Sequence, residues 1–206
     1  MKLVIATKSR GKVSEIRSIM GLTLKRHKND IEVLTLFDMP PLSSPAETGS
    51  TFAENAKIKG LYYADKLKAL CIADDSGVSV EALQGMPGVL SARFAGIGAT
   101  DEQNIELLLK RLSGHPRPWR ALFVCVMVAA LPGGRVVAQA TGAVQGEILP
   151  TPRGSTGFGY DPVFLIASHG KTMAELSIDE KNRISHRGVA MHSLINEMKN
   201  VGILMG

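Results

Sequence analysis

Apolar runs of strand length alternate along the chain with segments whose apolar residues recur at helical spacing. Residues 2–6, 31–36 and 70–73 form runs of the first kind, and each predicts a strand. Between residues 13 and 20, apolar side chains recur every three or four positions, so a polar loop and a helix follow the first strand. This mixed order of strands and helices predicts an α/β fold.

Capping boxes, in which a threonine is followed three residues later by Glu or Gln, mark the predicted helix starts. The first predicts a helix from Thr51 to about Lys68, and the second predicts a helix with an apolar face after Thr100. Thr172 caps a short helix in the same way, and Ser185 is the predicted cap of the last helix.

The longest apolar run, residues 122–131, overlaps a strand predicted over 120–130. A second strand at 135–140 follows a turn at 132–134. The ten residues of the longest run are about half of the roughly 20 that a membrane-spanning helix needs. Residues 1–12 become polar too early for the apolar part of a secretory signal. We therefore expect a cytoplasmic protein without a membrane partner.

Composition adds a bias in charge. With 206 residues, 45% of them hydrophobic and 21% charged, the chain is typical of a folded protein. A formal net charge of +5 favours an anionic partner, which can be a nucleic acid, a membrane surface or a phosphorylated metabolite. Cys71 and Cys125 form no CxxC motif, so no zinc or redox site is expected. Both lie in apolar runs, which predicts core residues.

The polar loop after the first strand has the composition of a phosphate-binding loop. It consists of Thr7, Lys8, Ser9, Arg10, Gly11 and Lys12. A helix N-terminus offers unpaired N–H groups and a positive dipole, and the basic and hydroxyl side chains add charge and donors. The first glycine of a Walker A loop is missing. A phosphate site and a solvated turn both fit this pattern.

Acidic and small polar residues replace the apolar run at 70–73. They are Asp74, Asp75, Ser76 and Gly77, at a predicted strand end, where α/β proteins gather catalytic groups. Successive strand side chains face opposite ways, so we expect one aspartate to face a cleft. An aspartate there can bind magnesium or activate a water molecule. An Asx turn fits the same residues.

Two lysines lie two positions apart in the helix predicted after Thr51. Because such residues do not share a helical face, only one of Lys57 and Lys59 can face phosphates and the other should face solvent. Glu54 is explained by its capping role, whereas Glu47, in the preceding loop, is not.

Two further segments combine aromatic or basic side chains with flexible glycines. Residues 157–162 contain Phe158, Gly159, Tyr160 and Asp161, a combination that can stack on a base and bind its edge, or form a turn whose aromatics fill the core. Lys181 and residues 185–188, with His186 and Arg187, can be surface residues or donors to a base carbonyl or phosphate.

Five segments, taken in order, cover nearly the whole chain: ATKSRGK, ETGSTFAENAKIKG, IADDSGVSVEALQGMPGVLSARFAG, GFGYDPVF and EKNRISHRG. Together they resemble the inosine triphosphatase family of non-canonical purine NTP pyrophosphatases. The chain departs from relatives in two places. Lys8 and Ser9 stand where bacterial relatives typically have Gly and Asn, and Ala46 precedes Glu47 where relatives often have two adjacent acids.

The resemblance implies a role for each segment. Asp75 is the implied catalytic, metal-binding carboxylate and proton acceptor, and Glu47 is an implied ligand of Mg²⁺ or a neighbour of one. The implied substrate contacts are Thr7, Lys8, Ser9, Arg10, Gly11, Lys12 and Lys59 for the triphosphate, Ser76, and a base pocket of Phe158, Gly159, Tyr160, Asp161, Lys181, His186 and Arg187.

The resemblance also implies an α/β fold with a mixed central sheet and helices, in two lobes around an active-site cleft, within a single domain over residues 1–206. It implies a homodimer that hydrolyses ITP, dITP and XTP to the monophosphate and pyrophosphate. Three alternatives stay open: a related nucleotide pyrophosphatase with another base preference, a nucleotide sensor without turnover, and a nucleic-acid-binding module. The last is disfavoured because the basic residues are dispersed and no nucleic-acid-binding motif is present.

Overall fold

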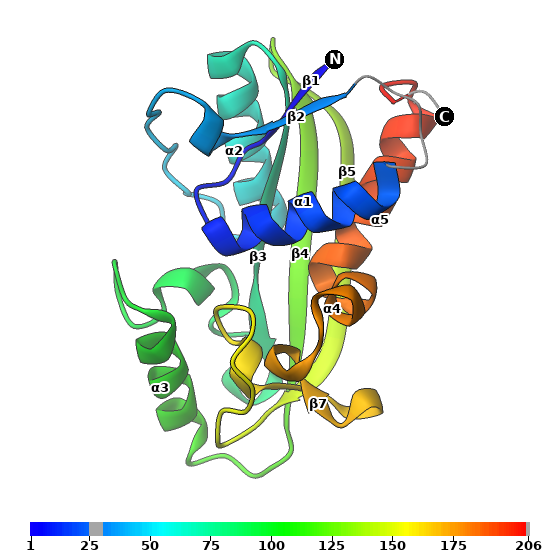
Figure 1. Ribbon diagram of the computed structural model, residues 1–206. Helices are drawn as coiled ribbons and strands as arrows, with labels where there is room; N and C mark the ends of the chain where they lie inside the picture. Colours follow the sequence, from blue (N-terminus) through cyan, green and yellow to red (C-terminus); the bar gives the residue numbers. More distant parts are fainter. Residues whose placement is uncertain (25–30, 205–206) are drawn as a thin grey trace. The chain divides into compact units, whose positions relative to one another are not determined.

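A computed structural model of the chain describes residues 1–24 and 31–204 (Figure 1). It contains a seven-stranded sheet in the order β2-β1-β3-β4-β5-β6-β7. β1 pairs in parallel with β2 and β3, whereas β6 pairs antiparallel with β5 and β7. The predicted α/β fold with a mixed sheet is therefore confirmed.

The strands are β1 (Lys2–Ile5), β2 (Glu32–Thr35), β3 (Leu70–Val80), β4 (Trp119–Leu131), β5 (Arg135–Ile148), β6 (Phe164–Ile166) and β7 (Lys171–Thr172). The helices are α1 (Arg10–Leu24), α2 (Phe52–Leu67), α3 (Asp101–Leu112), α4 (Ile178–Ile184) and α5 (His186–Asn200). Short 3₁₀ turns connect several of these elements.

The chain divides into two compact units. Unit 1 comprises Met1–Asp75, Cys125–Gly142 and His186–Gly206, and unit 2 comprises Ser76–Val124 and Ala143–Ser185. β3, β4 and β5 each contribute residues to both units. The two predicted lobes correspond to two units, and the cleft between them stays a prediction.

Unit 1 has a hydrophobic core on each face of its strands. In β3, Leu70 and Ile72 pack into a core with α1 and α5, whereas Cys71 and Ala73 pack into a second core with α2. This alternation follows from the period of two in a strand. α1 also packs against α5 (Figure 1). Both cysteines are buried, as predicted, with Cys71 in the core under α2 and Cys125 in the core under α1 and α5.

Unit 2 has a core of its own. Val78 and Val80 of β3 pack with apolar residues of α3, β4, β5 and β6. The core includes a stacked aromatic pair, Phe123 and Phe164, whose ring centroids are 4.0 Å apart. Each unit therefore has buried apolar residues that support its share of the functional side chains.

The predicted capping boxes at Thr51, Thr100 and Thr172 are all confirmed. α2 ends at the predicted place, with Lys68 as its C-cap. The Thr172 box begins a 3₁₀ turn instead of a regular helix. The sequence analysis missed α4, and Ser185 is the C-cap of that helix, its N–H donating to Lys181 O.

Two predicted strands proved too short. β3 does not end at Asp74 but continues to Val80, because Val78 and Val80 return to the apolar pattern and bury in the unit 2 core. β5 extends beyond the predicted 135–140 to Ile148. The predicted turn between β4 and β5 is confirmed, and Gly133 and Gly134 adopt positive φ there.

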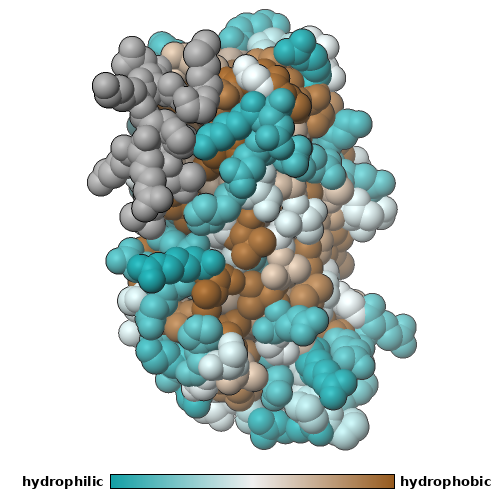
Figure 2. Space-filling view, turned by 90° about the vertical axis from the view of Figure 1, so that its right-hand side faces the viewer, coloured by the Kyte–Doolittle hydropathy of each residue, from teal (hydrophilic) through white to brown (hydrophobic). Residues whose placement is uncertain are grey.

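The surface carries both polar and apolar residues. Hydrophilic residues cover much of the face in Figure 2, with hydrophobic residues exposed among them. Within residues 1–24 and 31–204, no helix is long and apolar enough to span a bilayer.

Candidate active site

Asp74 and Asp75 point to opposite faces of β3 in unit 1. Asp74 continues the face of Leu70 and Ile72, under α1 and α5, and Asp75 continues the face of Cys71, under α2. The prediction that the two side chains point apart is confirmed by their partners. Asp74 pairs with Lys12 of α1, whereas Asp75 pairs with Lys59 of α2.

Asp75, Lys59 and Glu47 form a cluster of charged side chains. Lys59 Nζ donates to Asp75 Oδ1 at 2.7 Å and lies 3.4 Å from Glu47 Oε1. Asp75 Oδ2 is buried without a hydrogen-bond partner. Burial raises the pKa of Asp75 although Lys59 acts to lower it. Burial also opposes the charge of Lys59, but the nearby carboxylates of Asp74, Asp75 and Glu47 raise its pKa overall.

α2 positions both Lys59 and the loop that carries Glu47. Gly49 donates its N–H to the side chain of the buried Asn55 at 2.8 Å, which ties the loop to the helix. A side chain at Gly49 would collide with Glu54 and Asn55, so glycine permits this close approach. Lys57 is exposed, as expected when Lys59 turns toward the site.

Asp74 is surrounded by cations. Its Oδ2 lies 2.8 Å from Lys12 Nζ and 3.8 Å from Arg187 Nε, and the side chain is fully buried. Burial opposes its charge, but Lys12, Arg187 and Lys59 outweigh that effect and hold the pKa of Asp74 well below its usual range. Arg187 also forms an ion pair with Glu15 of α1.

The predicted phosphate loop is shorter than expected because α1 begins at Arg10. Ser9 caps the helix, its Oγ accepting from Lys12 N at 3.3 Å. Arg10 and Gly11 therefore lie in the first helical turn. The side chain of Lys8 donates to Leu42 O at 2.6 Å. Of the non-glycine residues that the structure describes, only Lys68 and Gln84 have positive φ. Lys8, which stands where relatives have glycine, therefore does not need a left-handed backbone conformation.

Two of the predicted phosphate-binding residues point elsewhere. The guanidinium of Arg10 lies 4.9 Å from the centre of the Phe37 ring, and Lys8 binds the segment that follows Phe37. Lys12 and Lys59 are the lysines that meet the aspartates of β3. Unit 1 thus brings together the carboxylates and two of the predicted lysines.

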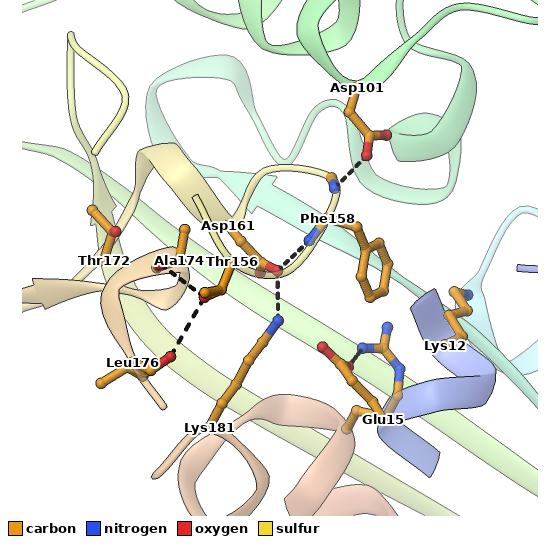
Figure 3. Close-up of polar contacts among 12 residues, drawn as sticks. Lys12, Glu15, Asp101, Thr156, Phe158, Asp161, Thr172, Ala174, Leu176 and Lys181 are labelled. Atoms are coloured by element: carbon orange, nitrogen blue, oxygen red, sulfur yellow. Dashed lines mark hydrogen bonds and ion pairs between the residues drawn. The ribbon is translucent and has the colours of Figure 1, made fainter. Parts of the chain in front are cut away.

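In unit 2, Asp161 organises the predicted base-binding loop (Figure 3). Its Oδ2 accepts from Lys181 Nζ at 2.5 Å and from Phe158 N at 2.8 Å. Lys181 Nζ lies 5.4 Å from the centre of the Phe158 ring. Gly157 has a φ of 83°, and a side chain there would collide with Asp161. The predicted residues Phe158, Asp161 and Lys181 are therefore in mutual contact.

Tyr160 has a structural position in the same loop. Its hydroxyl donates to Ser91 O at 2.9 Å and its ring packs in the unit 2 core. Ser91 Oγ also accepts from Val78 N, and a side chain at Gly77 would collide with Ser91. Ser76, the first residue of unit 2, is half-buried just before this contact.

His186 and Arg187 belong to unit 1, at the start of α5. Both are buried. The start of α5 packs closely on Gly142 of β5, where any side chain would collide with His186 O. That they share one base pocket with Phe158 and Lys181 stays a prediction, because Phe158 and Lys181 belong to unit 2.

The residues around Asp75 fit a hard divalent cation. Carboxylate oxygens are the ligands that Mg²⁺ prefers, and Asp75 Oδ2 is an acceptor that no donor satisfies. Across residues 1–24 and 31–204, no three His, Cys, Asp or Glu side chains gather as a metal cage. Mg²⁺ at nucleotide sites is commonly held by one or two carboxylates together with substrate phosphates, so Asp75 and Glu47 match that mode.

Comparison with known proteins identifies the family. The profile of the Ham1 family matches residues 3–197. The chain belongs to the Ham1 family. It is 46% identical over 201 residues to the dITP/XTP pyrophosphatase of Geobacillus kaustophilus, covering 97% of this chain and 95% of that one. The predicted resemblance to non-canonical purine NTP pyrophosphatases is confirmed at the level of the family.

Solved structures of Ham1 proteins share the fold. The Staphylococcus aureus Ham1 protein is 40% identical, with a TM-score of 0.82, covering 97% of this chain and 99% of that one. A HAM1 protein from Coxiella burnetii is 36% identical, with a TM-score of 0.83 and the same coverage of 97% and 99%.

Sequence reasoning missed three residues of this Ham1 site. Glu15 pairs with Arg187, Ser91 accepts from Val78 N, and Asp101 accepts from Gly159 N at 2.7 Å. Ser91 lies in the PGVLSARFAG segment, which had already been singled out as a motif. Asp101 carried no signal beyond its place in the first turn of α3, where acidic residues are common, and Glu15 lies in the second turn of α1 with no motif around it.

Proposed function

We propose that the chain hydrolyses the non-canonical purine nucleoside triphosphates ITP, dITP and XTP to the monophosphate and pyrophosphate, and so keeps these nucleotides out of DNA and RNA. The observation that carries the proposal is the buried, unsatisfied Oδ2 of Asp75 beside Lys59 and Glu47. The names of the relatives, dITP/XTP pyrophosphatases, support the choice of substrate.

Asp75 and Glu47 are the proposed ligands of Mg²⁺. When bound, the cation neutralises phosphate charge and polarises the phosphate oxygens. Lys59 lies between the two carboxylates and pairs with both, so it is placed to transfer its hydrogen bonds to the triphosphate. Two carboxylates do not fill the coordination shell of Mg²⁺, so substrate phosphates would supply further ligands.

Asp75 also orients the attacking water and accepts its proton. An ionised aspartate within reach of a water molecule can accept its proton. Water then attacks the α-phosphorus and pyrophosphate leaves. Lys12 and Lys59 bind the phosphates, together with the N–H groups at the start of α1 and the hydroxyls of Thr7, Ser9 and Ser76. Positioning and charge stabilisation therefore supply most of the rate.

Base selection is assigned to Phe158, Lys181 and the segment that carries His186 and Arg187. Phe158 stacks on the base, and Lys181 donates to the 6-oxo group of hypoxanthine or xanthine. Adenine presents an amino donor at that position, which cannot accept a hydrogen bond from the lysine. Such a mismatch costs about 1–3 kcal/mol, or roughly ten- to a hundredfold in kcat/KM.

We also propose that residues 1–206 act as one catalytic domain, since the family profile spans parts of both units. A cytoplasmic homodimer is the proposed state, on the resemblance to the inosine triphosphatase family. Light scattering coupled to size-exclusion chromatography measures the mass of the particle, and a mass of one chain at assay concentrations contradicts the dimer.

A substrate panel with product analysis tests the function. With Mg²⁺ at a fixed concentration, ITP and XTP should yield the monophosphate and pyrophosphate with kcat/KM at least about tenfold above that of ATP. GTP shares the 6-oxo group, so its rejection must come from its 2-amino group or from the shape of the pocket. Equal kcat/KM for ATP and ITP refutes the base pocket, and release of IDP with orthophosphate refutes cleavage at the α-phosphorus.

A further inference from the structure

The loop that carries Phe158 borders a cavity in unit 2. The cavity has a volume of about 620 Å³ and is lined by residues of α3, including Asp101 and Glu106, and by residues 154–159. Residues 151–157 are exposed. Because the loop lacks close packing on the side of the cavity, its hydrogen bonds must determine its shape.

The two ends of the loop are well anchored. Thr156 Oγ1 donates to Ala174 O at 2.8 Å (Figure 3), and the Tyr160 hydroxyl donates to Ser91 O at 2.9 Å. Between these anchors, the backbone beside the Phe158 ring is held by two carboxylates. Asp161 accepts from the N–H of Phe158, as described above.

The second carboxylate belongs to Asp101, the first residue of α3. Its Oδ2 accepts from Gly159 N at 2.7 Å (Figure 3). Gly159 has a φ of 61° and open space where a side chain would be. A peptide next to such a glycine can reorient with little steric resistance. The bond to Asp101 therefore fixes the orientation of the peptide that joins Phe158 to Gly159.

We propose that Asp101 is a positioning residue for base selection, which fixes the Phe158–Gly159 peptide and thereby the Phe158 ring beside Lys181. The proposal rests on the proposed function, in which Phe158 stacks on the base and Lys181 binds its 6-oxo group. A base that stacks on a misplaced ring does not bring its 6-oxo group to Lys181. Asp101 therefore acts on selectivity without touching the substrate.

Three variants isolate the hydrogen bond. Asp101→Ala removes the acceptor, whereas Asp101→Asn removes the charge at the helix start and keeps an oxygen acceptor. Glu106→Ala removes a carboxylate that lines the same cavity and bonds to none of the loop residues described above. A loss that arises only from charge near α3 would appear in the asparagine variant too.

We expect Asp101→Ala to lower kcat/KM for ITP about tenfold, mainly through KM, because the loss concerns binding of the base. For ATP, which gains little from Lys181, kcat/KM should change less than about twofold. The ratio of ITP to ATP therefore falls about tenfold. Asp101→Asn and Glu106→Ala should retain most of the wild-type ratio.

Amide hydrogen exchange followed by NMR tests the positioning itself, without reference to turnover. The Gly159 amide should exchange at least about tenfold faster in Asp101→Ala than in the wild type, and close to the wild-type rate in Asp101→Asn. The exchange rate tests the hydrogen bond to Asp101 even if the wild type shows no preference for ITP. Such a lack of preference would refute the proposed function and not the role of Asp101 in fixing the peptide.

An unchanged ratio of ITP to ATP in a folded Asp101→Ala protein overturns the proposal. So does unaltered exchange at Gly159, or an asparagine variant as impaired as the alanine variant in both measurements. Circular dichroism establishes that each variant is folded. If Asp101→Ala does not fold, Asp101→Leu, which also lacks an acceptor, is measured in its place against Asp101→Asn.

Discussion

Asp74 and Asp75 are neighbours on β3, yet the fold treats their charges in opposite ways. On the face under α1 and α5, the cations around Asp74 overcome the effect of burial and lower its pKa. On the face under α2, burial outweighs the pairing of Asp75 with Lys59 and raises its pKa. Two residues of the same type, one position apart, therefore have opposite electrostatic environments.

The difference separates a structural charge from a functional one. A lowered pKa means that folding favours the carboxylate, so Asp74 contributes stability at neutral pH that is lost as the pH falls through its folded-state pKa. A raised pKa means that folding disfavours the carboxylate, so the charge of Asp75 costs stability once it ionises. A costly charge with an unsatisfied oxygen is typical of a functional site.

The largest expected effect is on turnover in Asp75→Asn. We expect kcat/KM for ITP to fall at least about a thousandfold, because the substitution removes a metal ligand and a base. The free energy of unfolding should change by less than about 1 kcal/mol, since the fold already disfavours this charge. Steady-state kinetics and urea unfolding measure the two quantities, and a large loss of stability would contradict the comparison.

Asp74→Asn should show the reverse pattern. It leaves the half-buried Lys12 and the buried Arg187 without this carboxylate, which should lower the free energy of unfolding by about 3 kcal/mol. The loss lies at the lower end for a broken buried pair because Arg187 retains Glu15. Urea unfolding at pH 7 gives the value. Wild-type stability together with a loss of turnover as large as that of Asp75→Asn would remove the distinction between the two faces.

The lysines sharpen the comparison at the level of phosphate binding. Lys12→Ala and Lys59→Ala should each lower kcat/KM for ITP by roughly ten- to a hundredfold, because each loses charged hydrogen bonds to phosphate. Lys66→Ala, an exposed residue of the same helix as Lys59, serves as the control and should have less than about a twofold effect. Equal losses in all three variants would indicate that general positive charge is responsible.

The smallest expected effect is on the reactivity of the two cysteines, which lie in the cores on opposite faces of the unit 1 strands. Burial raises the pKa of both thiols to about 12, so neither should react with a disulfide reagent at pH 8 while the protein is folded. In Asp74→Asn, Cys125 should react faster than Cys71, because it lies in the core on the loosened face. Mass spectrometry of the labelled peptides measures both rates, and equal rates would indicate that both faces open together.

Much of the fold was predictable because its signals are local. The capping boxes at Thr51 and Thr100 and the apolar run that predicts a strand over residues 120–130 depend on neighbours along the chain, and each was confirmed. The end of β3 was predicted wrongly, because the aspartates looked like the end of a buried run. Lysines from two distant helices compensate their charges, and that compensation is not visible in the local sequence.

The candidate site was predictable in its residue types more than in their partners. Asp75, Lys59 and Glu47 form a cluster, and Phe158, Asp161 and Lys181 form another. Arg10 was assigned to phosphate from its place in the loop, but its guanidinium lies over Phe37, a contact across the fold that spacing cannot reveal. Asp101 and Glu15 were missed for the same reason.

Metal binding tests the division of labour between the two aspartates most directly. Mn²⁺ can replace Mg²⁺ at oxygen sites, and its binding with a non-hydrolysable ITP analogue can be followed by electron paramagnetic resonance. The account predicts that Asp75→Asn weakens Mn²⁺ binding at least about tenfold, whereas Asp74→Asn, measured at a temperature at which it is folded, binds Mn²⁺ nearly as the wild type does. Wild-type binding in Asp75→Asn, or a selective loss in folded Asp74→Asn, would contradict it.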